Sequence, residues 1–335
     1  MSAAVLLLAH GAPERVEDVD EYLSFVRAGG PVSPQVAAEV RRRYQEIGGG
    51  SPMLARTREQ AQALQARLGV PVYFGMRNWH PFLRETLARM QTAGVERIVA
   101  LCLAPQYSKL SVGFYFRRTQ EAKQELGYSA EIVWTKSFHD HPLLIEAFQE
   151  KLAAELPAEQ VLFTAHSLPE KILENADPYD REARGTAALV AARASLANWE
   201  FAYQSQGMSG ERWLGPAVES KLDEYAARGI KQVVLQPIGF VSDHVEVLYD
   251  VDILFRGYAA ARGIALSRPE SLNASPKFIE ALADVARQKL SRDPEPSRDR
   301  APSGREADLA NRHGHFMTGP NITTLRIYGP LDRIS

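Results

Sequence analysis

Two histidines follow matching stretches of the chain and are candidates for proton or metal chemistry. His10 lies in "VLLLAHGAPE" and His166 lies in "VLFTAHSLPE", and six of the ten positions are identical. Histidine titrates near neutral pH and also ligates metals, so each one has the chemistry of a general base or of a ligand. A more ordinary interpretation, in which each side chain only hydrogen-bonds the turn after its strand, stays open. The repetition at matched positions weighs against it.

A pair of carboxylates lies in "GFVSDHVEVLYDVD" (239–252), after an apolar run. Glu246 and Asp250 are four residues apart and share one face of the predicted helix, where two negative charges repel each other unless a cation or solvent intervenes. Carboxylate oxygen together with histidine nitrogen is a ligand set for Fe²⁺, Zn²⁺ or Mn²⁺, and His244 is a spare candidate ligand. The structural alternative is a capping box, with Asp243 as the N-cap and Glu246 three residues later.

A glycine-rich loop and its basic neighbours predict a site for an anion. In "RRRYQEIGGGSPM" (41–53) three glycines allow the backbone to approach a ligand closely. Ser51 followed by Pro52 predicts an N-cap and a first helical residue, where unpaired N–H groups favour a phosphate or a carboxylate. Arg27 and Arg43 are candidate cations, and the aromatic side chains near these loops suit a flat apolar ligand. The chain has neither a Walker motif nor G-x-G-x-x-G, which disfavours a nucleotide.

Apolar runs alternate with helical patterns, which is typical of an α/β protein whose parallel sheets are covered on both faces. Strands are predicted at 5–10, 70–76, 97–104, 131–135, 161–167, 201–205 and 232–240, and helices at 54–68, 81–93, 114–126, 142–155, 216–227 and 275–290. This many strands predict two similar doubly wound, Rossmann-like domains, at residues 1–140 and 141–290, with the last helix able to pack back on the first. Ligands bind beyond the carboxyl ends of such strands, which brings His10 and His166 to one cleft.

The composition excludes several classes of protein. Of the 335 residues 45% are hydrophobic and the formal net charge is −2, so no global positive field attracts nucleic acid. The single cysteine, Cys102, excludes an intramolecular disulfide and a four-cysteine iron–sulfur cluster. No apolar run approaches the roughly 18 residues of a membrane span, and the N-terminal run lacks signal-peptide features, so we expect a cytoplasmic, soluble monomer. Residues 291–335 are rich in proline, serine and charge, which predicts a disordered tail.

Four motifs resemble the ferrochelatase family, which inserts Fe²⁺ into porphyrins: "FTAHSLPEK", "QPIGFVSDHVEVLYDVD", "YQSQGMSGERWLGP" and "RRRYQEIGGGSP". The resemblance covers roughly residues 3 to 290. It implies two Rossmann-like domains with an active-site cleft between them, Fe²⁺ as a substrate, and neither an organic cofactor nor an iron–sulfur cluster. It implies His166 and Glu246 as the catalytic and metal-binding pair, and Asp250 as a secondary acid. The porphyrin contacts that it implies are His10 as an axial ligand, Arg27, Arg43, Tyr44, Ser51 and Tyr115.

Within the family the chain is most similar to the coproporphyrin III enzymes, because its segment between "AHGAP" and "RRRYQEIGG" is short. Those enzymes often carry tyrosine at the position of His10. Relatives often have a second arginine where this chain has "RAGG", and some carry another acid where it has Leu254. The expected product is coproheme for haem biosynthesis, with a haem-accepting or downstream pathway enzyme as a partner. The alternatives are a protoporphyrin IX ferrochelatase giving protohaem, a cobalt or nickel chelatase for another tetrapyrrole, and a non-enzymatic porphyrin-binding protein.

The expected chemistry needs a base near neutral pH, because the macrocycle loses two N–H protons as iron enters. We expect His166 to accept a pyrrole proton or to hold the incoming iron, with Glu246 as its partner. The sequence does not separate these two tasks. His10 is expected to ligate the iron after insertion, since histidine is a known haem ligand.

Overall fold

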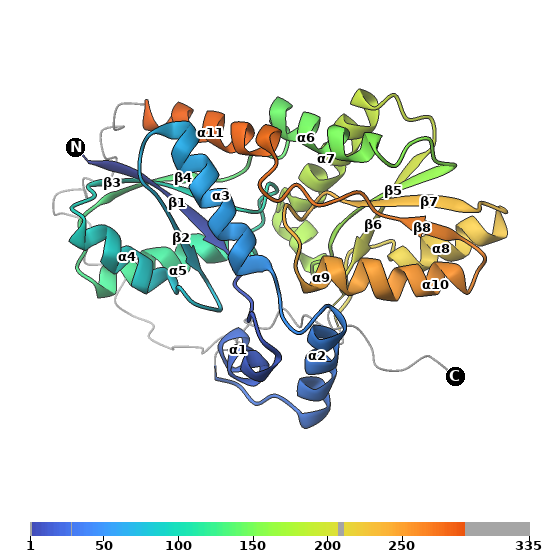
Figure 1. Ribbon diagram of the computed structural model, residues 1–335, viewed down its shortest axis with the longest axis horizontal. Coiled ribbons are helices and arrows are strands. Elements are labelled where there is room, and N and C mark those ends of the chain that lie inside the picture. Colours follow the sequence, from blue (N-terminus) through green and yellow to red (C-terminus); the bar gives the residue numbers. More distant parts are fainter. Residues whose placement is uncertain (1, 28, 207–210, 292–335) are drawn as a thin grey trace, which may run out of the picture.

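The computed structural model describes residues 2–27, 29–206 and 211–291, and the predicted disordered tail lies outside them apart from its first residue. Within the described residues, eight strands form two separate sheets in which every pairing is parallel. Figure 1 shows the two sheets side by side, each flanked by helices. This arrangement confirms the predicted α/β fold with two similar halves.

The two sheets have the same strand order. The first sheet has the order β2-β1-β3-β4, with β1 (Ala3–Ala9), β2 (Val72–Met76), β3 (Arg97–Cys102) and β4 (Glu131–Thr135). The second sheet has the order β6-β5-β7-β8, with β5 (Gln160–His166), β6 (Trp199–Gln204), β7 (Gln232–Pro237) and β8 (Ala265–Ser267). Strands β1 and β5 therefore occupy equivalent interior positions, and His10 and His166 lie at equivalent strand ends. The sequence pattern does not predict β8, because its three residues make too short an apolar run.

Helices surround both sheets and connect successive strands (Figure 1). Around the first sheet are α3 (Met53–Leu68), α4 (Leu83–Thr92) and α5 (Val112–Glu125), and around the second are α6 (Pro142–Ala153), α7 (Tyr179–Arg193), α8 (Val218–Ala227) and α10 (Arg256–Ala260). Shorter helical segments are η1 (Val16–Asp18), η2 (Glu170–Asn175), α9 (Val245–Leu248) and the π-helical η3 (Asp250–Phe255). Helices α1 (Val19–Val26) and α2 (Pro34–Glu46) project from the body. In the described part of the chain, no helix is long and apolar enough to cross a membrane.

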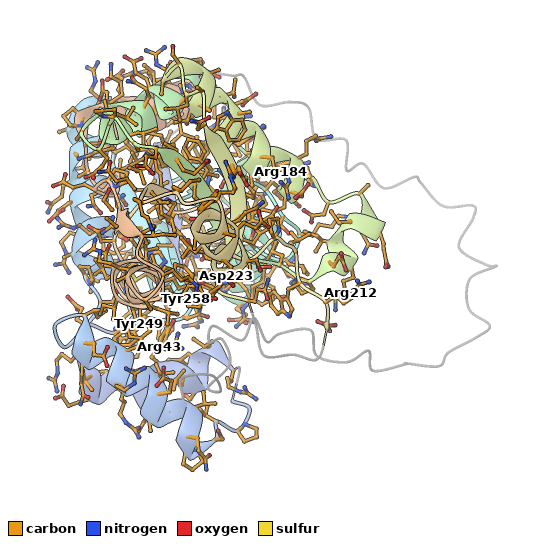
Figure 2. All side chains as sticks on the ribbon, turned by 90° about the vertical axis from the view of Figure 1, so that its right-hand side faces the viewer. Arg43, Arg184, Arg212, Asp223, Tyr249 and Tyr258 are labelled. Atoms are coloured by element: carbon orange, nitrogen blue, oxygen red, sulfur yellow. The ribbon has the colours of Figure 1, made fainter. Side chains whose placement is uncertain are left out.

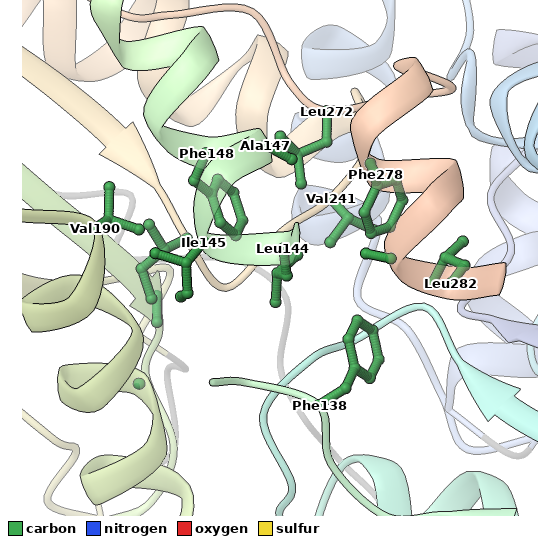
Figure 3. Packing of buried hydrophobic residues seen from close by; sticks show 14 of the residues in the cluster. Phe138, Leu144, Ile145, Ala147, Phe148, Val190, Val241, Leu272, Phe278 and Leu282 are labelled. Atoms are coloured by element: carbon green, nitrogen blue, oxygen red, sulfur yellow. The ribbon is translucent and has the colours of Figure 1, made fainter. Parts of the chain in front are cut away.

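One large apolar cluster joins the two halves. It contains Val5 of β1 and Phe163 of β5, together with residues of α6 and of α11 (Pro276–Leu290). Figure 3 shows part of this cluster, including Leu144 on α6 and Phe278 on α11. Because α11 packs against α3 of the first half as well as against α6, the chain returns to the first half after completing the second sheet. The domain boundaries at residues 140 and 290 stay predictions.

Two predicted helix starts are wrong. Helix α3 begins at Met53 with Pro52 as its N-cap, and the Ser51 hydroxyl accepts a hydrogen bond from the Met53 N–H at 3.3 Å. The carbonyl of Pro52 accepts a hydrogen bond from the Arg56 N–H at 3.0 Å, four residues on, so Pro52 is the N-cap and the helix begins one residue later than predicted.

The predicted capping box at Asp243 is also wrong. Helix α9 begins at Val245 with His244 as its N-cap, and no side chain caps it. Asp243 instead accepts a hydrogen bond from the Asn273 amide at 2.8 Å and pairs with Arg268 at 3.7 Å. These partners are distant in sequence, and they hold the carboxylate away from the helix end.

Gly50 provides a test of the close contact between the loop after β1 and the connection from α2 to α3. A Cβ atom added at Gly50 would lie 1.8 Å from the carbonyl oxygen of Glu14. Gly50→Ala should therefore lower the free energy of unfolding, measured in urea, by at least the ~1–3 kcal/mol that overpacking usually costs. Gly257→Ala is the control, because nothing lies within 4 Å of its added Cβ. Equal unfolding midpoints for the two variants would contradict the contact.

Candidate active site

A mainly apolar cavity lies where the carboxyl ends of the two sheets meet. Its polar lining includes His10, Arg77 and Tyr115 from the first half, and His166, His244 and Glu246 from the second. The two strand-end histidines therefore reach one cavity, as the sequence predicts. Apolar walls reduce the local dielectric response, so the interactions among these polar groups are stronger than they would be in water.

The tautomer of His166 is fixed by the residue after it. The Nδ1 atom of His166 lies at hydrogen-bond distance from the carbonyl oxygen of Ser167. A carbonyl only accepts, so Nδ1 carries the proton and the lone pair of the neutral ring lies on Nε2. That Nε2 atom is 3.7 Å from Oε1 of Glu246. In its neutral form His166 thus presents the lone pair of Nε2 beside a carboxylate, which suits a base or a metal ligand.

Glu246 is a buried carboxylate between two imidazole rings. Its Oε2 atom is 3.8 Å from Nε2 of His244, whose Nδ1 donates to the Ser242 carbonyl at 2.9 Å. Burial acts to raise the pKa of Glu246, but His166 and His244 outweigh it and the pKa falls to about 2. In return Glu246 raises the pKa of His244, although burial alone would lower it. The carboxylate is therefore ionised at neutral pH.

His10 is neutral at physiological pH. Burial, and then the Arg77 guanidinium, lower its pKa to about 3. Its Nε2 atom is 3.0 Å from Nδ2 of Asn78, and its Nδ1 atom is 3.5 Å from Nη2 of Arg77. A neutral imidazole can ligate a metal, but here the metal must first replace one of these polar neighbours.

Asp250 is buried where α2 approaches η3. Its Oδ1 atom is 3.5 Å from Nη1 of Arg43, and the Ser205 hydroxyl donates to Oδ2 at 2.6 Å. Burial raises the pKa of Asp250 to about 7; Arg43 lowers it, and Glu246 adds to the rise. The prediction that one regular α-helix carries both Glu246 and Asp250 is wrong. Helix α9 ends at Leu248, and the π-helical segment begins at Asp250.

Arg43 binds other side chains of the protein and is not among the residues that line the cavity. Its Nε atom donates to Glu39 at 2.8 Å, and its guanidinium carbon lies 4.8 Å from the centre of the Tyr249 ring. Figure 2 shows Arg43 and Tyr249 where α2 meets the rest of the molecule. The structure therefore places Arg43 between α2 and the segment that carries Glu246 and Asp250.

The remaining predicted porphyrin contacts divide into two groups. Tyr115 lines the cavity, whereas Tyr44, Ser51 and Arg27 are not among its lining residues. Tyr44 is fully buried, with its ring centre 6.4 Å from that of Tyr22. Ser51 is buried beneath the loop after β1, and Arg27 ends α1.

The cavity lining includes side chains that the sequence prediction missed, among them Tyr22, Arg77 and Tyr179. Arg77 follows β2 directly, and its guanidinium carbon lies 4.9 Å from the ring centre of Tyr115. The rule that ligand sites form at the ends of parallel strands applies to β2 as well, and it would have indicated Arg77. Tyr22 and Tyr179 belong to helices, and only the packing of those helices brings them to the cavity.

A family model described as Ferrochelatase matches residues 2–290. The chain belongs to the ferrochelatase family. A ferrochelatase from Acidobacterium capsulatum is 45% identical over 313 residues, which cover 87% of this chain and 95% of that protein. A coproporphyrin III ferrochelatase from Bacillus subtilis is 34% identical over 304 residues, covering 86% and 98% of the two chains. The family predicted from the sequence motifs is therefore confirmed. The protein is a metal chelatase, which is a kind of lyase, and its substrates are Fe²⁺ and a porphyrin.

Solved structures share the fold of this ferrochelatase at low sequence identity. SirB from Bacillus subtilis with Fe³⁺ has a TM-score of 0.57 and 12% identity, covering 87% of this chain and 96% of that one. CbiX, described as the terminal enzyme for sirohaem biosynthesis in denitrifying bacteria, has a TM-score of 0.51 and 14% identity, covering 86% and 100%. These similarities show the chelatase-like fold alone. Family membership, by contrast, supports a ferrochelatase over a cobalt or nickel chelatase and over a carrier.

The raised pKa of Asp250 predicts how the stability of this ferrochelatase depends on pH. An unfolded aspartate titrates near 3.8, and Asp250 in the folded protein titrates near 7. The stabilising contribution of protonated Asp250 is therefore fully present below about pH 4 and is lost as the pH rises through about 7. Between about pH 5 and pH 8 the free energy of unfolding of the wild type should fall relative to that of Asp250→Asn, measured by urea unfolding at each pH.

Asp252→Asn is the control for this measurement. Asp252 lies in the same segment but pairs with Arg268 at 2.7 Å, and its variant should follow the wild-type pH dependence. Parallel pH curves for the wild type and Asp250→Asn would show that Asp250 does not titrate in this range.

Proposed function

We propose that this ferrochelatase inserts Fe²⁺ into coproporphyrin III, that the product is coproheme for haem biosynthesis, and that the reaction needs no organic cofactor. The choice of porphyrin is supported by relatives named coproporphyrin III ferrochelatase that align over nearly their whole length, such as the Bacillus subtilis protein. The observation that carries the chemistry is the pair of His166 Nε2 and Glu246 Oε1, 3.7 Å apart in a mainly apolar cavity.

His166 and Glu246 are proposed as the catalytic and metal-binding pair. The lone pair on Nε2 of His166 can accept a pyrrole proton or bind Fe²⁺, and the ionised Glu246 favours either positive charge. A proton taken up by His166 lies next to the carboxylate, which stabilises the imidazolium. A metal ion at the same place would be bound by one nitrogen and one oxygen.

His10 is proposed as the axial ligand of the inserted iron. Its neutral ring suits this role, because only an unprotonated nitrogen can bind a metal. The nitrogen that binds iron must give up its contact with Asn78 or Arg77. The insertion of iron and its ligation by His10 are therefore separate events. A variant that loses ligation by His10 can still insert iron.

The porphyrin is proposed to contact Tyr115, which lines the cavity, and Arg27, Arg43, Tyr44 and Ser51. Coproporphyrin III carries four carboxylates, so a cation such as Arg43 is a suitable partner for one of them. Such a carboxylate would compete with Glu39 and Asp250 for the guanidinium.

Protoporphyrin IX is the second candidate substrate. The relative from Acidobacterium capsulatum, at 45% identity, is named only ferrochelatase, which leaves the porphyrin unspecified.

We also propose that the protein is a cytoplasmic monomer. Its product is proposed to pass to a haem-accepting or downstream pathway enzyme.

The test is anaerobic insertion of Fe²⁺ by purified protein, run in parallel with coproporphyrin III and protoporphyrin IX and followed by visible absorption. We expect the higher kcat/KM with coproporphyrin III. His166→Ala should reduce kcat by about 10²-fold or more, the usual contribution of a general base, while coproporphyrin III still binds.

His80→Ala serves as the matched control, because His80 is largely exposed and pairs with Glu85. Its kcat should equal that of the wild type. Faster turnover of protoporphyrin IX would refute the choice of porphyrin alone, and full activity of His166→Ala would refute the role of His166.

A further inference from the structure

A buried carboxylate that the proposed chemistry does not use joins the two halves of the molecule. Asp177 lies between η2 and α7 and is 8% exposed. Its Oδ2 atom accepts hydrogen bonds from the Ser108 hydroxyl at 3.0 Å and from the Lys109 N–H at 2.8 Å. Its Oδ1 atom accepts from the Tyr179 N–H at 3.1 Å. Ser108 and Lys109 belong to the loop between β3 and α5, so one carboxylate bridges the first half and the start of α7.

Tyr179 extends this connection to the active site. Its N–H is bound to Asp177, and its hydroxyl donates to the carbonyl oxygen of His166 at 2.8 Å. Tyr179 lines the cavity and is 6% exposed, so little water competes for that hydrogen bond. The loop bound by Asp177 also lines the cavity, through Gln106 and Ser111. Asp177 is therefore linked both to a wall of the cavity and to the backbone of the proposed base.

Glu182, one turn into α7, holds the same loop at a second point. Its Oε2 atom accepts hydrogen bonds from the Tyr107 N–H and from the Ser137 hydroxyl, both at 2.7 Å. The Gln106 amide donates to Thr186 of the same helix at 3.1 Å. These contacts hold the loop against the body of α7, so a change at Asp177 should move the start of α7, where Tyr179 lies, while the rest of this interface stays in place.

We propose that Asp177 is a positioning residue for metal insertion, which holds the loop after β3 and Tyr179 together and thereby places His166 relative to the first half. The proposal rests on the role proposed for His166. All three donors bound by Asp177 need acceptors. In Asp177→Asn one oxygen becomes an NH₂ group that faces a donor. A displacement of about 1 Å in a catalytic group can cost on the order of 10²-fold in rate.

The test compares Asp177→Asn, Tyr179→Phe and the double variant with the wild type. It measures kcat, KM for Fe²⁺ and, by fluorescence quenching, the dissociation constant of coproporphyrin III. We expect kcat to fall about tenfold or more in each single variant, with little change in porphyrin affinity. The two losses should not add in the double variant, because both substitutions break one connection. Tyr179→Phe removes only a hydroxyl, so it carries the test if Asp177→Asn does not fold.

The pH profile separates positioning from stability. A displaced His166 changes its distance from Glu246 and so shifts the apparent pKa in the kcat/KM profile for Fe²⁺, which a loss of stability does not do. Glu174→Gln, an exposed carboxylate in η2, is the control and should match the wild type.

Variants with wild-type kcat and wild-type pH profiles below their melting range would overturn the proposal, whatever their melting temperatures. If the wild type inserts iron into neither porphyrin, the proposed function fails together with this inference. If the wild type and the variants are equally active, only the inference about Asp177 fails.

Discussion

The ionised Glu246 carboxylate is the group on which the rest of the site depends. A charge in apolar surroundings is costly unless it is paired, and here two imidazole nitrogens at 3.7 and 3.8 Å offset its burial. Both rings are oriented by backbone carbonyls, those of Ser167 and Ser242, which bind Nδ1 and leave Nε2 toward the carboxylate. An incoming dication therefore meets a negative charge together with the Nε2 atoms of two imidazole rings. The fold must hold those two backbone segments in place for the site to exist.

The repeated sheet explains how such distant residues meet, and the surroundings of each strand end explain why the two halves differ chemically. His10 and His166 follow equivalent strands. His10 is strongly disfavoured as a cation by its burial and then by the Arg77 guanidinium beside it, whereas His166 lies beside Glu246. A dication is attracted by Glu246 and repelled by Arg77. The duplicated backbone thus supplies two similar positions, and the neighbouring charges give them unlike properties.

Much of this fold can be predicted from local patterns in the sequence. Continuous apolar runs between helical segments predict the parallel strands, and the strand-end rule places His10 and His166 in one cavity. Local patterns do not predict the partner of a side chain that could bind either a nearby helix end or residues distant in sequence. Asp243 suits a helix cap by sequence, yet it pairs with Arg268 and Asn273. No local pattern encodes that choice. The sequence also does not predict the π-helical segment that begins at Asp250, because Glu246 and Asp250 are four residues apart whether the helix is regular or not.

Arg43 is suited to substrate binding by its charge and is at the same time part of the packing between α2 and the second half. Its sequence context indicates a cation available to an anion, but α2 holds it against Glu39, Tyr249 and Asp250. The pair with Asp250 is long, at 3.5 Å, and burial already favours the neutral form of that carboxyl. A porphyrin carboxylate, proposed here to bind Arg43, would compete with the weaker partner Asp250 more easily than with Glu39, which lies at 2.8 Å. Because Asp250 begins the segment after the Glu246 helix, such an exchange would change the electrostatic surroundings of the His166–Glu246 pair.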